Sequence, residues 1–153
     1  MSGVHSQYPV SIRWDGARRG TGSSVDGLPD LSIGPPPSFG GIAGLWTPEH
    51  LFVLAATSCW LTTFLAVAAA SKLDLAAVDC SGKGTLELGE DRRFRISAIT
   101  LRPRVEVTRE GDRDLALRLV QKAESVCLIR NSIRTEVTMD PEIQVAAESL
   151  VHA

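Results

Sequence analysis

Residues 47–70 read TPEHLFVLAATSCWLTTFLAVAAA and contain the most apolar stretch of the chain. Thr47 can cap a helix, Pro48 suits the first helical position, and Glu49 suits the positive end of the helix macrodipole. No proline or glycine interrupts the stretch after Pro48. We therefore predict a helix over 48 to about 71, and because it is apolar nearly all round we expect it to be buried.

The same stretch is long enough to be taken for a membrane span, because about 20 apolar residues cross a bilayer. It is rich in alanine, however, and it carries several small polar side chains: Thr57, Ser58, Cys59, Thr62 and Thr63. These features favour the central helix of a soluble protein. The start of the sequence has no positive segment followed by an apolar one, so we expect no signal peptide, a cytoplasmic location and no membrane partner.

The composition is typical of an ordinary globular protein. The chain has 153 residues, of which 44% are hydrophobic and 22% charged, and its formal net charge is −2. This length suits one domain over 1–153 with a sizeable core. This slightly negative charge is unlike the basic surface of nucleic-acid-binding proteins, so we expect no nucleic-acid partner.

Weaker patterns lie on both sides of the long helix. Before it, alternating residues predict strands over 7–14 and 28–33, separated by glycine-rich turns. After it, we predict strands over 78–88 and 94–108 with Pro103 at an edge or bulge, a helix over 111–127, a helical turn over 131–134, and a last strand over 135–139. Strands, long helix, strands, helix and strand make an α+β fold rather than a repeat of βα units.

The three cysteines of a chain without export signals are expected to be reduced. Cys59 lies about three turns into the long helix, where it can be a core residue that packs as a small hydrophobe, or a functional thiol whose thiolate is stabilised. Cys127 lies at the end of the second helix, a more accessible place. Cys80 falls in a strand, and we interpret it as structural. No spacing of His, Cys or Asp matches a metal site, and we expect no cofactor.

Three segments of the sequence resemble the OsmC/Ohr family of osmotically inducible and organic hydroperoxide resistance proteins. Residues 47–59 look like its first signature, Asn-Pro-Glu-x-Leu running into an alanine-rich helix with Cys ten residues after the Glu. Residues 124–131, ESVCLIRN, are similar to the second, in which Pro, an apolar residue, Ser and Asn usually follow the Cys. Here Leu128 stands in the place of Pro, and Arg130 in the place of Ser. Residues 18–27 resemble the Arg-x-Gly to Asp-Gly stretch of the Ohr branch, with Arg13, Arg18 and Arg19 competing for the Arg.

The resemblance implies an OsmC-like fold, with antiparallel sheets around a long central helix, in an intertwined homodimer with thiol sites at its interface. It implies that the protein reduces organic hydroperoxides, with Cys59 as the peroxidatic thiol and Cys127 as the resolving thiol. A Cys59 sulfenic acid would condense with Cys127 to a disulfide, which a dithiol reductant would reopen. Arg18 would lower the pKa of Cys59, and Glu49 would hold the Arg18 guanidinium. Apolar walls favouring organic peroxides would come from Phe39, Trp46, Trp60 and Ile129.

The spacing of Glu49 and Cys59 adds a prediction about the dimer. They are ten residues apart on one predicted helix, which is about 15 Å along its axis. An arginine held by Glu49 cannot easily also touch Cys59 of the same chain. We therefore predict that Glu49 serves the partner subunit's site, with the two long helices crossing antiparallel.

Two other interpretations stay open. One is a non-enzymatic OsmC-fold dimer that binds a small apolar or electrophilic ligand or senses redox state. The other is a structural α+β dimer whose cysteines only fill the core. Convergence of Arg18 and Glu49 on Cys59, with Cys127 within disulfide reach, would separate the enzyme from both.

Overall fold

The protein is described by a computed structural model over residues 3 and 5–147. The chain divides into two compact units, Met1–Leu51 and Phe52–Ala153. The boundary between them falls within the long helix α1 (Pro48–Ala70). The order of elements is three strands, α1, two strands, two helices and two strands, which confirms the predicted α+β class.

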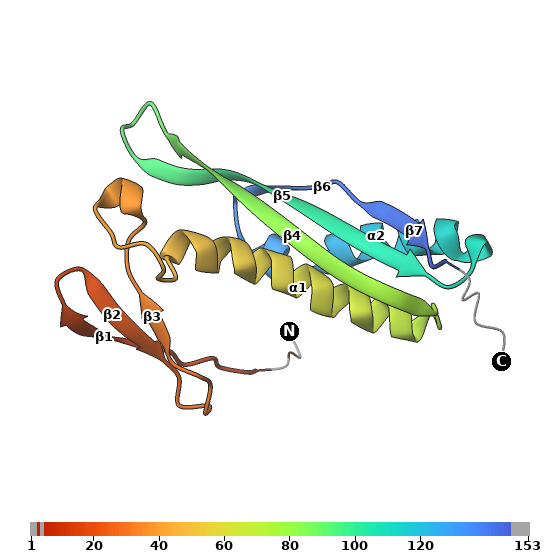
Figure 1. Ribbon diagram of the computed structural model, residues 1–153, viewed down its shortest axis with the longest axis horizontal. Coiled ribbons are helices and arrows are strands. Elements are labelled where there is room, and N and C mark those ends of the chain that lie inside the picture. Colours follow the sequence, from red (N-terminus) through yellow and green to blue (C-terminus); the bar gives the residue numbers. More distant parts are fainter. Residues whose placement is uncertain (1–2, 4, 148–153) are drawn as a thin grey trace. The chain divides into compact units, whose positions relative to one another are not determined.

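The first unit holds an antiparallel sheet of three strands in the order β1 (Ser11–Gly16), β2 (Arg19–Ser23) and β3 (Leu31–Ile33), followed by a short 3-10 turn, η1 (Pro37–Phe39). Figure 1 shows these strands in red and orange. Strands were predicted near β1 and β3, whereas β2 was interpreted as turns because of its glycines. A Cβ on Gly20 would lie 2.9 Å from the carbonyl oxygen of Arg13. Glycine is therefore needed there for close strand pairing and not for a turn.

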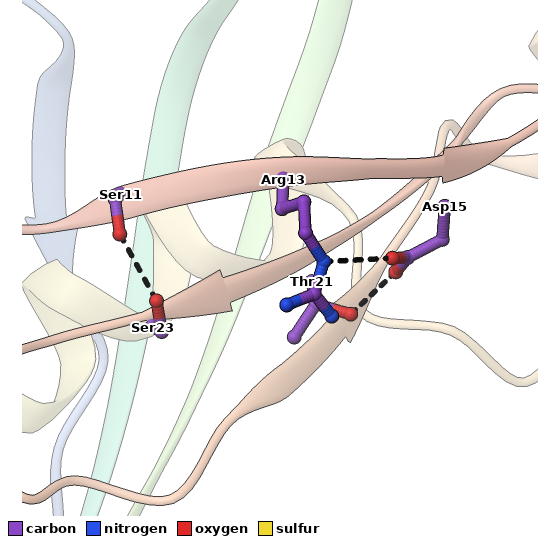
Figure 2. A network of polar contacts seen from close by, with 5 residues as sticks. All are labelled: Ser11, Arg13, Asp15, Thr21 and Ser23. Atoms are coloured by element: carbon purple, nitrogen blue, oxygen red, sulfur yellow. Dashed lines mark hydrogen bonds and ion pairs between the residues drawn. The ribbon is translucent and has the colours of Figure 1, made fainter.

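Polar side chains tie β1 to β2, as Figure 2 shows. The Asp15 carboxylate accepts hydrogen bonds from the Thr21 hydroxyl and from Arg13 Nε, the latter at 3.3 Å. The Ser11 and Ser23 hydroxyls lie 3.0 Å apart across the strands. The bond from Thr21 is the main cause that lowers the pKa of Asp15, and Arg13 adds to it. Arg13 and Asp15 thus form an ion pair at the surface.

The second unit is built on a long antiparallel ribbon of β4 (Leu75–Leu88) and β5 (Phe94–Val107), seen in green in Figure 1. Two short strands, β6 (Glu136–Met139) and β7 (Glu142–Val145), both run parallel to β5. β6 pairs with 98–101 and β7 with 104–107, so the two follow one another along the same edge. The predicted strands β4, β5 and β6 are confirmed, and β7 was not predicted.

The prediction that Pro103 marks an edge or a bulge is wrong. Pro103 is fully buried in the central strand β5, where it pairs with Cys80 of β4. The pairing of β5 with β6 ends at Leu101, and the pairing with β7 begins at Arg104. Pro103 therefore lies in the gap between the two short strands, where a residue without an N–H removes no hydrogen bond on that side.

Helices α1 and α2 (Arg113–Val126) supply the rest of the core of the second unit. A short 3-10 turn, η2 (Glu110–Asp112), precedes α2, and α3 (Leu128–Ser132) follows it. On α1 the rings of Trp60 and Phe64 stack with their centroids 5.0 Å apart. Trp60 Nε1 donates to the carbonyl of Val120 at 3.3 Å, which fixes α1 against α2.

Helix α1 begins as predicted, with the Thr47 hydroxyl accepting the N–H of His50 at 3.0 Å. Its burial is confined to one face, made of Ala56, Thr57, Trp60, Phe64 and Ala68. Leu54 and Leu65 are 43% and 42% exposed. The helix is long and apolar enough to cross a membrane, and only 28% of its most apolar window is buried in this chain. The prediction of burial on all sides is therefore wrong for the single chain, because other elements cover only one side.

Candidate thiol site

The structure brings Cys59 and Cys127 together within the second unit. Cys59 is half-buried on α1, and Cys127 is 2% exposed between α2 and α3. Cys127 ends α2 because its backbone is extended, with φ −64° and ψ 116°, and the chain then restarts as α3. Both thiols are reduced, and they contact each other through a hydrogen bond.

The donors around Cys59 come from the start of α3. The first N–H groups of a helix have no partner within the helix. Here the N–H groups of Leu128 and Ile129 donate to the sulfur of Cys59. The Thr63 hydroxyl, one turn further along α1, lies 4.0 Å from Cys59 Sγ. The sulfur is therefore surrounded by uncharged hydrogen-bond donors.

The pKa values of the two thiols are shifted in opposite directions. Burial is the largest single influence on Cys59 and disfavours its thiolate, but the bonds from Ile129, Cys127, Thr63 and Leu128 together outweigh it. The pKa of Cys59 is consequently lowered below its ordinary value. Burial raises the pKa of Cys127, and its contact with Cys59 raises it further. Cys59 is thus the member of the pair that ionises first.

Of the two departures from the second family signature, the one at Leu128 acts on this pair. Proline has no N–H, so Leu128 supplies Cys59 with a donor that the usual residue would lack. Arg130 donates its backbone N–H to Cys127. Its guanidinium Nε lies 3.6 Å from Glu124 Oε1, an ion pair between α3 and α2.

The third cysteine has a different environment. Cys80 is half-buried on β4, and its thiol donates to the carbonyl of Ser81 at 3.6 Å. Burial raises the pKa of Cys80 to about 11. This thiol is therefore protonated at neutral pH.

In the first unit, Arg18 and Glu49 line one cavity of about 620 Å³. Arg19 lines it too, and Arg18 Nη1 donates to the carbonyl of Phe39. Glu49 Oε2 is buried and has no hydrogen-bond partner among the described residues. Of the three arginines that compete for the predicted site, Arg18 and Arg19 line this cavity, and Arg13 is not among its lining residues.

The four residues predicted to form apolar walls around the thiol lie in different environments. Trp60 is fully buried in the core, so the prediction that it faces a substrate is wrong. Ile129 is half-buried beside Cys59, and Phe39 lines the cavity of Arg18. Trp46 is 44% exposed and packs edge-on against His50. Within 3 and 5–147, no three side chains of His, Cys, Asp or Glu gather into a metal site.

Sequence reasoning missed the donors at Cys59. Thr63 could have been found, because it lies one helical turn after Cys59 on the same face. The N–H groups of Leu128 and Ile129 carry no side-chain signal, since they depend on where α2 breaks.

These features define an α+β protein with two contacting thiols, one of them on the central helix. The chain belongs to the OsmC-like protein family, whose family model matches residues 41–142.

Relatives and solved structures agree over most of the chain. An uncharacterized protein of Acinetobacter baylyi is 29% identical over 138 residues, which cover 89% of this chain and 92% of that protein. An OsmC-like protein of unknown function from Vibrio cholerae superposes with a TM-score of 0.81 at 21% identity, covering 90% of this chain and 99% of that one. An organic hydroperoxide resistance protein OsmC from Legionella pneumophila superposes with a TM-score of 0.72 at 25% identity, covering 94% and 100%. The predicted OsmC-like fold is confirmed.

Proposed function

We propose that the protein reduces organic hydroperoxides in the cytoplasm, with Cys59 as the peroxidatic thiol and Cys127 as the resolving thiol. The observation that carries the proposal is the contact between two reduced thiols whose pKa values are shifted in opposite directions. A nucleophilic thiolate beside a protonated second thiol is what a two-cysteine peroxidase needs. Organic hydroperoxide resistance proteins among the solved structures of the same fold support it.

The chemistry has an oxidation by the peroxide, a condensation that releases water, and a reduction. The Cys59 thiolate attacks the terminal oxygen of the peroxide, the O–O bond breaks, and the alkoxide takes up a proton and leaves as an alcohol. The thiol of Cys127 then attacks the sulfenic acid sulfur, so that a disulfide forms and the hydroxyl leaves as water with the Cys127 proton. An external dithiol reopens the disulfide by exchange and is itself oxidised. The N–H groups of α3 stabilise the attacking thiolate.

We further propose a homodimer in which Arg18 and Glu49 serve the partner subunit's Cys59. Glu49 and Cys59 lie ten residues apart on α1, about 15 Å along the helix axis. Glu49 has an unsatisfied buried oxygen, and a guanidinium could satisfy it in fork geometry. The exposed apolar face of α1, with Leu54 and Leu65, supports a second copy as the covering partner.

Intact-protein mass spectrometry after one equivalent of an organic hydroperoxide tests the proposal. The wild type should lose two hydrogens, and Cys80→Ser should do the same as a matched control. Cys59→Ser and Cys127→Ser should not, and a sulfenic acid should be trapped only in Cys127→Ser. No mass change under conditions that oxidise a control thiol peroxidase would reject the proposal. Oxidation without turnover in the presence of a dithiol would favour a redox sensor instead.

A further inference from the structure

The break between α2 and α3 at Cys127 is not required by the local sequence. Residues 113–132 contain no proline and no glycine, so the segment could form one continuous helix. The backbone of Cys127 is nevertheless extended, and α2 ends at Val126 while α3 begins at Leu128. Contacts beyond local helix preference therefore hold the chain in the broken conformation.

The break decides which acceptors the first N–H groups of α3 use. In a continuous helix each N–H donates to the carbonyl four residues earlier, so Leu128 would donate to Glu124. By the same rule, Ile129 would donate to Ser125. In the broken chain both N–H groups donate instead to the sulfur of Cys59. Closing the break would therefore take two donors away from the Cys59 thiolate.

Two side-chain contacts span the break, and we call them the junction contacts. Asn131 Nδ2 donates to the carbonyl of Ser125 at 3.2 Å, which is the acceptor that Ile129 would use in a continuous helix. Arg130 Nε lies 3.6 Å from Glu124 Oε1. Each contact joins residues six apart, which a continuous helix would separate by about one and two-thirds turns and place on different faces. Both junction contacts therefore favour the break.

The ion pair of the junction is partly protected from water. The side chains of Arg130 and Glu124 are 38% and 25% exposed. Arg130 Nε is buried and makes no hydrogen bond among the described residues, so the Glu124 carboxylate is the charge that compensates it. A half-buried pair is screened less by solvent than an exposed one, so separating these two charges by closing the break is unfavourable.

We propose that the two junction contacts hold the N–H groups of α3 on the Cys59 sulfur, with Asn131 and Arg130 as positioning residues. Their side chains act through the backbone at Cys127 and not on the sulfur directly. The usual family residue at position 128, proline, would exclude the continuous helix by itself. This chain has Leu128 there and uses side chains to the same end. The role in catalysis rests on the proposed peroxidase function, whereas the effect on the acidity of Cys59 does not.

Alkylation of the reduced protein tests the positioning without any peroxide. The double variant Asn131→Ala/Arg130→Ala lacks both junction contacts, so the reaction of Cys59 with iodoacetamide at pH 7 should slow about fivefold and its pH profile should move to higher pH. Ser132→Ala is the matched control, because the Ser132 hydroxyl donates to the Leu128 carbonyl four residues earlier, a contact that a continuous helix would keep. An unchanged rate and pH profile in the double variant would overturn the inference.

Exchange of the two charges tests the ion pair by itself. Glu124→Arg places two cations opposite each other, and the alkylation of Cys59 should slow about twofold. Glu124→Arg/Arg130→Glu reverses the pair and should restore the rate. Arg130→Lys should keep most of it. A reversed pair that stays as slow as Glu124→Arg, with the fold retained by circular dichroism, would overturn the role of the ion pair.

Proline separates positioning from general destabilisation. Leu128→Pro removes one donor and also excludes the continuous helix, and alone it should slow the alkylation of Cys59 about threefold. If the junction contacts act by holding the break, they become dispensable once proline holds it. Leu128→Pro in the double variant should therefore give the threefold loss of Leu128→Pro alone. The product of the two losses, about fifteenfold, would indicate independent effects and would overturn the inference.

Peroxide consumption with a dithiol reductant then connects the junction to the reaction. The kcat/KM for an organic hydroperoxide should fall about fivefold in the double variant and stay unchanged in Ser132→Ala. Equal kcat/KM values of the wild type and the double variant would overturn the role in catalysis. If the wild type consumed no peroxide, the proposed function would fail, while the alkylation rates would still decide whether the junction contacts position the donors.

Discussion

Cys59 and Cys80 are both half-buried cysteines of the same compact unit. The pKa of Cys59 is nevertheless lowered from the ordinary value of a thiol, and that of Cys80 is raised. Burial is the largest influence on each of them. It raises the pKa of Cys80 to about 11, whereas hydrogen-bond donors overcome it at Cys59. The difference lies in the backbone nearby. The start of α3 supplies two backbone N–H donors to Cys59, in addition to Thr63 and Cys127. Cys80 receives one backbone N–H, from Arg102, and the charge of Asp79 acts in the opposite direction. The number of hydrogen-bond donors around each thiol therefore decides whether the effect of burial on its pKa is outweighed.

The largest expected effect is the contrast in alkylation rates. At pH 8 a thiol with a pKa of about 11 is about one thousandth thiolate, whereas the lowered pKa of Cys59 gives this thiol a much larger thiolate fraction. Iodoacetamide should therefore modify Cys59 at least about a hundredfold faster than Cys80 in the native protein. Peptide mass spectrometry of a time course measures both rates. The Cys59 rate should reach its plateau at lower pH, and similar rates would show that burial alone decides.

Removing the thiol donor should have the next largest effect. Cys127→Ala takes away one hydrogen bond to the Cys59 sulfur, and alkylation of Cys59 at pH 7 should slow about fivefold. Cys127→Ser keeps a donor of similar size and should slow the reaction much less. Both rates are measured by quenching the alkylation at successive times and quantifying the modified Cys59 peptide by mass spectrometry. Identical rates in the two variants would indicate that contact with Cys127 does not stabilise the thiolate.

Leu128→Pro removes a single backbone donor with little other change. Cys127 already has the extended backbone that precedes a proline, and proline suits the first helical position. The pKa of Cys59 should rise, and its alkylation rate at pH 7 should fall about threefold. Leu128→Ala keeps the N–H and serves as the matched control. An unchanged rate in Leu128→Pro, with the fold retained by circular dichroism, would contradict the role of the N–H.

The smallest effect is expected from Thr63→Val, which removes the hydroxyl that lies 4.0 Å from Cys59 Sγ. Such a long contact to sulfur is weak, so the alkylation rate of Cys59 should fall by less than about twofold. Thr62→Val is the control, because the Thr62 hydroxyl donates to the Cys59 carbonyl rather than to its thiol. A larger loss in Thr62→Val than in Thr63→Val would contradict this assignment.

The sequence predicted the elements whose signals are local. Thr47 and Pro48 marked the start of α1, and alternation marked β4 and β5. Strand β2 was missed, because the reason for glycine at Gly20 is a neighbouring carbonyl on another strand.

The candidate site was predicted only at the level of side chains. The cysteine pair came from the resemblance, and the structure places the two thiols in contact. Trp60 was assigned to the wrong side, because a helix that is apolar all round does not indicate which face meets the core. The backbone donors could not be predicted from side-chain patterns, since they depend on the extended conformation of Cys127 that ends α2.

The place of α1 in the chain has a consequence for synthesis. A ribosome completes this helix, with a mean hydropathy of 2.0, before it makes any of the strands that cover it, and at about 5–20 residues per second the wait lasts several seconds. The nascent helix therefore exposes apolar surface that other unfinished chains can bind. Cys59 is also made long before Leu128 and Ile129, so in the unfinished chain it has the acidity of an ordinary cysteine. It becomes an acidic thiol only when the segment after α2 has left the ribosome and folded.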